Sequence, residues 1–131
     1  MQIIIEPLEK AVKSLEEVLA MPIDDIIRDS TIQRFEYSFE LSWKMLKRFL
    51  KEAFDNKDIE QDTFIEIIKK SAKHGLINNQ EIWLEFRETR NYTSHAYSEN
   101  NAKQAYFVAQ RFLSEAQSLV TKLQEINQRL V

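Results

Sequence analysis

The scarcity of turn-forming residues limits the possible folds of this chain more than any other feature. It contains one glycine and two prolines in 131 residues, whereas the tight turns that join β-strands usually require such residues. A helical bundle needs few of them. The sequence therefore predicts an all-α fold. The length suits one helical domain over residues 1–131, with a core that needs no disulfide or structural metal.

Apolar residues that recur every three or four positions predict two helices in the first half of the chain. The first has Pro7 in its first turn and ends before Pro22. The second is expected to follow an N-cap at Asp29 or Ser30 and to continue to Ala53. Its core-facing stripe is predicted to contain Ile32, Phe35, Phe39, Ser42, Leu46 and Phe49, widened by Trp43.

Two shorter helices are predicted after a polar loop at residues 55–61. The first begins at Asp62 with Thr63 and ends at His74 and Gly75, because a glycine commonly follows the last helical turn. The next begins near Asn79 and runs into the segment RNYTSHAY.

The last predicted helix starts near Asn101, after a break at residues 98–101, and continues to the C-terminus. Its unbroken apolar seam predicts that part of it packs against another chain, unless the helix frays after about Lys122. Together these patterns predict an up-and-down bundle of four to five helices.

Composition excludes several functional classes. The chain has no cysteine, so thiolate catalysis and cysteine-ligated zinc are excluded, and a reducing cytosol is compatible. No apolar run is long enough for a membrane span. We find no glycine-rich phosphate loop and no metal-binding motif. We therefore expect a cytoplasmic protein without metal or cofactor. The net charge of -3 means that any RNA binding must come from a local patch.

The segment from Arg90 to Tyr97 places a guanidinium, an imidazole and a phenol close together in the sequence. Arginine matches phosphate oxygens, and the imidazole of His95 titrates near neutral pH. Five residues of regular helix separate Arg90 and His95 by about 140° around the axis. A dimer that shares a cleft, or a helix break near Thr93 or Ser94, would bring such side chains together.

Structural roles are the alternative for each of these residues. A histidine near a helix end often interacts with terminal carbonyl groups, and Arg90 alone would pair with a surface acid such as Glu85 or Glu88. Glu36 and Glu40 are predicted to lie on a solvated helix face of mixed charge. The tryptophans and phenylalanines are predicted to be core residues rather than a platform for stacking bases.

Three sequence blocks carry a resemblance to a known family. They read IQRFEYSFELSWKMLKRFL at 32–50, AKHGLI at 72–77 and EIWLEFRETRNYTSHAY at 81–97, followed by the closing heptad helix. In this order they resemble the nucleotidyltransferase substrate-binding family of the HEPN superfamily. The best-known relatives are the HepT toxins, which are encoded beside a small nucleotidyltransferase antitoxin called MntA.

The resemblance implies a helical bundle that forms a homodimer, with the Arg-X4-His-X-Tyr signature of each subunit in one cleft. Active members are metal-independent ribonucleases. The signature assigns catalysis to Arg90 and His95, substrate binding or orientation to Asn91, and modification by AMP to Tyr97.

Two functions remain open at the level of sequence. The chain is either a ribonuclease toxin silenced by a partner nucleotidyltransferase, or a non-catalytic substrate-binding and docking subunit of a two-component nucleotidyltransferase. A scaffold that keeps the motif for dimer contacts is a third hypothesis.

Overall fold

A computed structural model describes residues 2–93 and 98–130, and it confirms the all-α prediction. In the described part of the chain there are five α-helices, one 3₁₀ turn and no strand. They are α1 (Glu6–Leu19), α2 (Asp25–Glu52), η1 (Ile59–Gln61), α3 (Phe64–Lys73), α4 (Gln80–Thr93) and α5 (Glu99–Arg129).

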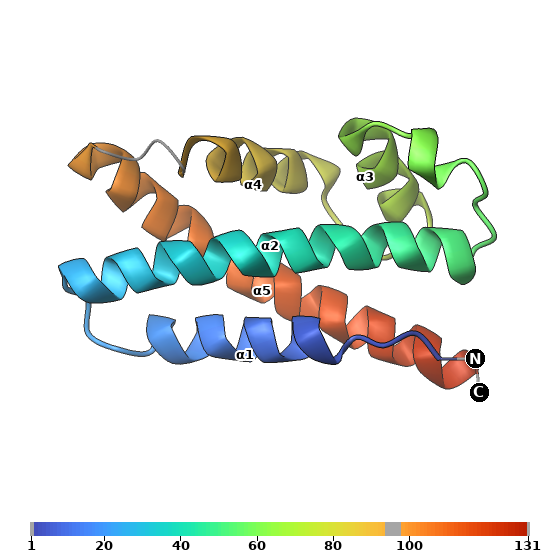
Figure 1. Ribbon diagram of the computed structural model, residues 1–131, viewed down its shortest axis with the longest axis horizontal. Coiled ribbons are helices and arrows are strands. Elements are labelled where there is room, and N and C mark those ends of the chain that lie inside the picture. The colour runs from blue at the N-terminus through green and yellow to red at the C-terminus, as the bar shows by residue number, and fades with distance from the viewer. Residues whose placement is uncertain (1, 94–97, 131) are drawn as a thin grey trace.

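The helices form an up-and-down bundle around α2 (Figure 1). Helix α1 lies along one side of α2, and α3 and α4 lie along the other side. Helix α5 crosses behind α2 and contacts α1, α2 and α4. None of the described helices is long and apolar enough to cross a membrane.

Helix α2 begins earlier than the sequence predicted. The prediction of Asp29 or Ser30 as its N-cap is wrong, because Asp24 holds that position and its carboxylate accepts a hydrogen bond from the Ile27 backbone N–H at 2.7 Å. Several residues in this stretch favour an N-cap. Asp24 is the first of them to follow Pro22 and it accepts from one of the free N–H groups, so the later candidates lie inside the helix.

The predicted boundaries of the shorter helices are confirmed. Thr63 caps α3 in a reciprocal capping box with Glu66. Gly75 follows the helix with a φ of 75°, a conformation that glycine adopts without strain. Asn79 accepts a hydrogen bond from the Ile82 N–H at 3.2 Å at the start of α4.

The C-terminal helix buries more of its seam within the chain than expected. It does not fray after Lys122 but continues to Arg129, and Leu119 and Leu123 are buried. Near its end, the Asn127 side chain exchanges two hydrogen bonds with the Ile3 backbone, at 2.9 and 2.8 Å. The homodimer remains a prediction, but a surplus of unburied seam no longer supports it.

Phe112 on α5 is the centre of an aromatic cluster that joins three helices. Its ring centroid lies 5.2 Å from that of Phe35 and 6.2 Å from that of Phe39, both on α2. On α4, the rings of Trp83 and Phe86 lie 5.8 and 5.2 Å from it. All these rings are buried, so the cluster fixes how α4 lies against α2.

Phe112→Ala should lower the free energy of unfolding by about 3–5 kcal/mol, because it removes a buried ring and leaves a cavity among four others. Urea denaturation followed by circular dichroism measures the loss. Phe107→Ala is the matched control, since Phe107 lies on the same helix and is 63% exposed. Equal losses in the two variants would contradict the central role of Phe112.

Candidate functional site

Arg90 is presented by the last described turns of α4. The inner face of this helix consists of Trp83, Phe86, Thr89 and Thr93, all buried. Arg90 lies at the edge of this face, and its side chain is 27% exposed. The packing of α4 therefore fixes the backbone of Arg90 and leaves part of its guanidinium accessible to solvent.

Two acids of α2 meet Arg90. Its Nη1 lies 3.3 Å from Oε2 of Glu36, and its Nε lies 3.4 Å from Oε1 of Glu40. Within the described part of the chain, the buried Nε makes no hydrogen bond, so its contact with Glu40 is an ion pair only. One guanidinium thus balances two carboxylates that are one helical turn apart.

These contacts were not apparent from the sequence. Spacing along one helix indicated a mixed-charge surface for Glu36 and Glu40, and it offered Glu85 or Glu88 as partners for Arg90. In the structure Glu85 instead pairs with Arg111 of α5. The spacing of residues along one helix does not report a contact between two helices. The one available signal for these ion pairs was the position of two acids, one turn apart, in the middle of a helix.

Of the four predicted site residues, Arg90 and Asn91 lie in the described part of the chain. Asn91 is exposed beside Arg90, and Thr93 donates a hydrogen bond from Oγ1 to the Arg90 carbonyl at 2.9 Å. His95 and Tyr97 lie outside the described residues. Arg90 and Asn91 line the same hollow.

This hollow, which we call the aromatic hollow, lies between α2, α3 and α4. Its volume is about 310 Å³. The rings of Trp43 and Phe64 form its apolar part, with centroids 4.6 Å apart, and the Arg87 guanidinium lies 4.7 Å from the Phe64 centroid. The residues that line it are Phe39, Glu40, Trp43, Phe64, Arg87, Arg90 and Asn91.

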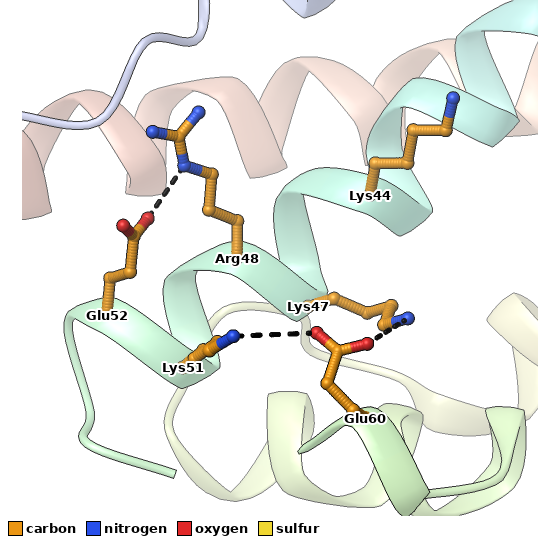
Figure 2. Close-up of a pocket in the computed structure, with 6 residues that line it drawn as sticks. All are labelled: Lys44, Lys47, Arg48, Lys51, Glu52 and Glu60. Atoms are coloured by element: carbon orange, nitrogen blue, oxygen red, sulfur yellow. Dashed lines mark hydrogen bonds and ion pairs between the residues drawn. The ribbon is translucent and has the colours of Figure 1, made fainter. Parts of the chain in front are cut away.

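A second hollow of about 350 Å³ lies further along α2 and is mainly basic (Figure 2). Glu60 lies between Lys47 and Lys51, at 3.5 and 3.8 Å, and Figure 2 shows both lysines directed at its carboxylate. Arg48 pairs with Glu52 at 2.7 Å. We call this the basic hollow, because four cations and two acids line it. Among the described residues, Lys44 makes no ion pair, whereas the other three cations do.

No group of three or more histidine, aspartate or glutamate residues that could hold a metal ion occurs in residues 2–93 and 98–130. The side chains that line the aromatic hollow offer charged and aromatic groups for binding. Its chemistry is suited to a ligand that combines an anion with a flat, polar ring.

Comparisons with known proteins agree with this architecture. Residues 4–125 match the family model described as nucleotidyltransferase substrate binding protein like. A Haemophilus influenzae protein described as probable ribonuclease HepT is 36% identical over 107 residues, which cover 81% of this chain and 73% of that protein.

Two solved structures are similar along most of the chain. One, from Haemophilus influenzae, is described as revealing the fold of a substrate binding domain of a nucleotidyltransferase. It has a TM-score of 0.85 and 31% identity, covering 92% of this chain and 99% of that one. The other, from Thermus thermophilus, has a TM-score of 0.80 and 26% identity, covering 88% and 98%.

Arg90→Ala should cost less than about 1 kcal/mol of stability, because ion pairs with partly exposed partners contribute little. Glu36→Gln in the same chain should recover part of any loss by relieving the repulsion between the two carboxylates. Urea denaturation of the single and double variants measures both effects. A loss of several kcal/mol would instead make Arg90 a structural residue.

Proposed function

Because the chain belongs to the nucleotidyltransferase substrate binding protein like family, we propose that it is a HepT-like ribonuclease that cleaves RNA without a metal ion. The relative described as a probable ribonuclease supports this proposal. The observation that carries it is the location of Arg90. A partly exposed guanidinium beside an aromatic hollow is suited to binding an RNA phosphate.

In the proposed reaction, the 2′-hydroxyl of one nucleotide attacks the adjacent phosphorus, and the 5′-oxygen of the next nucleotide leaves. His95 accepts the proton of the 2′-hydroxyl and returns a proton to the leaving oxygen, so the imidazole ends as it began. Arg90 donates hydrogen bonds to the non-bridging oxygens as their negative charge grows. The products carry a 2′,3′-cyclic phosphate and a free 5′-hydroxyl. Asn91 orients the imidazole or binds a phosphate oxygen.

Glu36 and Glu40 would hold Arg90 in place when no RNA is bound. Their side chains are 28% and 46% exposed, so water screens the two ion pairs and each is weak. A phosphate that approaches Arg90 replaces one carboxylate, and that carboxylate returns to water. The exchange costs little, whereas Arg90 in a fully buried ion pair would be unavailable to substrate.

The basic hollow on α2 provides the local positive charge that an acidic chain needs to bind RNA. Lys44 lies one turn beyond Glu40 in α2. Figure 2 shows Lys47, Arg48 and Lys51 further along the same helix. We propose that these cations contact phosphates that flank the scissile bond.

Regulation is proposed to act at Tyr97, in a homodimer whose subunits share the cleft. A small MntA-like nucleotidyltransferase would be the partner and antitoxin. The Tyr97 phenol oxygen would bond to the α-phosphorus of an adenine nucleotide and lose its proton, while the remaining phosphates leave. The added AMP would place an anion near Arg90, where it competes with the RNA phosphate.

A docking role is the second candidate. The family description and the similar Haemophilus influenzae structure both refer to substrate binding by a nucleotidyltransferase, without naming catalysis. In this role the chain would present a substrate to a partner enzyme and would cleave nothing itself.

Purified protein free of any partner should cleave RNA in EDTA and leave cyclic phosphate ends. His95→Ala should lower the rate by about 10²–10⁴-fold, and Arg90→Ala by about 10²–10³-fold, because each removes a group that acts in the transition state. Gel assays with end-group analysis measure both. Arg111→Ala, which removes a guanidinium paired elsewhere, should retain activity. Absence of cleavage by the wild type would favour the docking role.

Co-expression with a neighbouring nucleotidyltransferase should add one or more AMP groups to the chain and stop RNA cleavage. Tyr97→Phe should abolish the mass gain, whereas Tyr92→Phe, which removes a phenol five residues earlier, should retain it. Intact-mass spectrometry distinguishes the two variants. An AMP adduct that persists in Tyr97→Phe would assign the modification to another residue.

A further inference from the structure

The proposed cleavage chemistry does not explain the aromatic hollow. It uses Arg90 and its ion-pair partners, and it leaves Trp43, Phe64 and Arg87 without a role. Trp83 is buried in the core, but Trp43 is only partly buried and lines the hollow. Half-buried aromatic rings beside cations are a common arrangement for binding single-stranded nucleic acid.

We propose that the aromatic hollow is a nucleobase subsite, which binds the base next to the scissile phosphate and prefers guanine. This inference rests on the proposed ribonuclease function, because it concerns the same RNA whose phosphate Arg90 binds. It adds a specificity determinant for that RNA from residues other than the signature.

The size and composition of the hollow fit one base. Its volume of about 310 Å³ is at the lower end of the range for small-molecule sites. Trp43 packs on Phe64 with centroids 4.6 Å apart, which leaves no room for a base between these two rings. The base would therefore stack on the outer face of Trp43 or on the Arg87 guanidinium, which Phe64 supports from beneath at 4.7 Å.

Lys47 is the side chain that a stacked base would displace. Its Nζ lies 5.8 Å from the Trp43 ring centroid, and 3.5 Å from a carboxylate oxygen of Glu60. Both contacts are long, and a lysine side chain changes its rotamer readily. After a base displaces it from the Trp43 ring, the Lys47 ammonium would remain near Glu60 and could contact the phosphate of the bound nucleotide.

Glu40 gives the subsite its preference among bases. A carboxylate only accepts hydrogen bonds, so it favours a base edge with adjacent N–H donors. Guanine presents two such donors on its Watson–Crick edge. Adenine and cytosine present one amino group beside an acceptor, and uracil presents one N–H between two carbonyl groups. The expected order is guanine first, adenine and cytosine next, and uracil last.

An acidic peptide is a poorer fit to the same residues. Its carboxylates would pair with Arg87 and Arg90, but Glu40 would repel them. A peptide carboxylate also provides no aromatic ring to stack on Trp43. A nucleotide uses all of these groups at once, since it combines an anion, an aromatic plane and an edge of donors.

Binding to short oligonucleotides tests the stacking part of the proposal. The probes are fluorescent 2′-O-methyl pentanucleotides, which lack the attacking hydroxyl and remain uncleaved, with the sequences UUGUU, UUAUU and UUUUU. Trp43→Leu should weaken binding of UUGUU by about tenfold, as expected for the loss of one stacking platform. Trp43→Phe should bind with intermediate affinity, and circular dichroism verifies that both variants are folded.

Phe54→Leu is the matched control, because Phe54 is also partly buried but lies just after the end of α2 and stacks on His74, outside the hollow. It should bind all three probes as the wild type does. Equal affinities for Trp43→Leu and Phe54→Leu would overturn the subsite.

A pair of glutamine variants tests the base preference. Glu36→Gln and Glu40→Gln each remove one carboxylate from Arg90, but only Glu40 lines the hollow. The wild type and Glu36→Gln should bind UUGUU about tenfold more tightly than UUUUU, and Glu40→Gln should lose most of this difference. Equal preference in both variants, or none in the wild type, would overturn the assignment of Glu40.

The binding assay separates this inference from the ribonuclease proposal, because it requires no cleavage. A wild type that cleaves RNA but binds the three probes equally would retain the proposed function and overturn the subsite. A wild type that binds UUGUU through Trp43 and cleaves nothing would retain the subsite and overturn the ribonuclease.

Discussion

The contact of Phe112 with rings from α2 and α4 is the interaction on which the rest of the site depends. Its ring packs against those of Phe35 and Phe39 on α2 and that of Phe86 on α4. Because buried rings pack in few arrangements, these contacts fix the register of α4 against α2. Glu40 follows Phe39 directly, and Arg90 lies one turn beyond Phe86, so the register of the core determines which acids face the arginine.

The charges around Arg90 reflect two opposing requirements. A guanidinium that is mostly removed from water needs anionic partners, yet a substrate phosphate must be able to replace them. Two partly exposed carboxylates meet both requirements, since neither contact is strong enough to prevent the exchange. The same carboxylates repel a phosphate until Arg90 binds it. Affinity should therefore depend on salt and on the cations further along α2.

Sequence reasoning predicted the helices well and the charge contacts poorly, for one physical reason. Capping and apolar periodicity are local, so Thr63, Gly75 and the all-α class were predicted correctly. The start of α2 was missed, because Asp24 is one of several residues there that can cap a helix. The ion pairs of Arg90 with Glu36 and Glu40 arise from packing between helices, which no local pattern records.

The prediction that the tryptophans and phenylalanines form the core was correct for Trp83, wrong for the exposed Phe107 and incomplete for Trp43. Both tryptophans belong to apolar stripes, but Trp43 widens its stripe beyond the width that the bundle covers, and its ring remains partly exposed against Phe64. Phe64 is itself part of the core cluster. The aromatic hollow thus lies at the exposed margin of the core. The core packing around Phe64 holds the ring against which Trp43 rests. A fixed platform suits the proposed subsite, because it would hold a stacked base at a constant position relative to Glu40, whose carboxylate provides the preference.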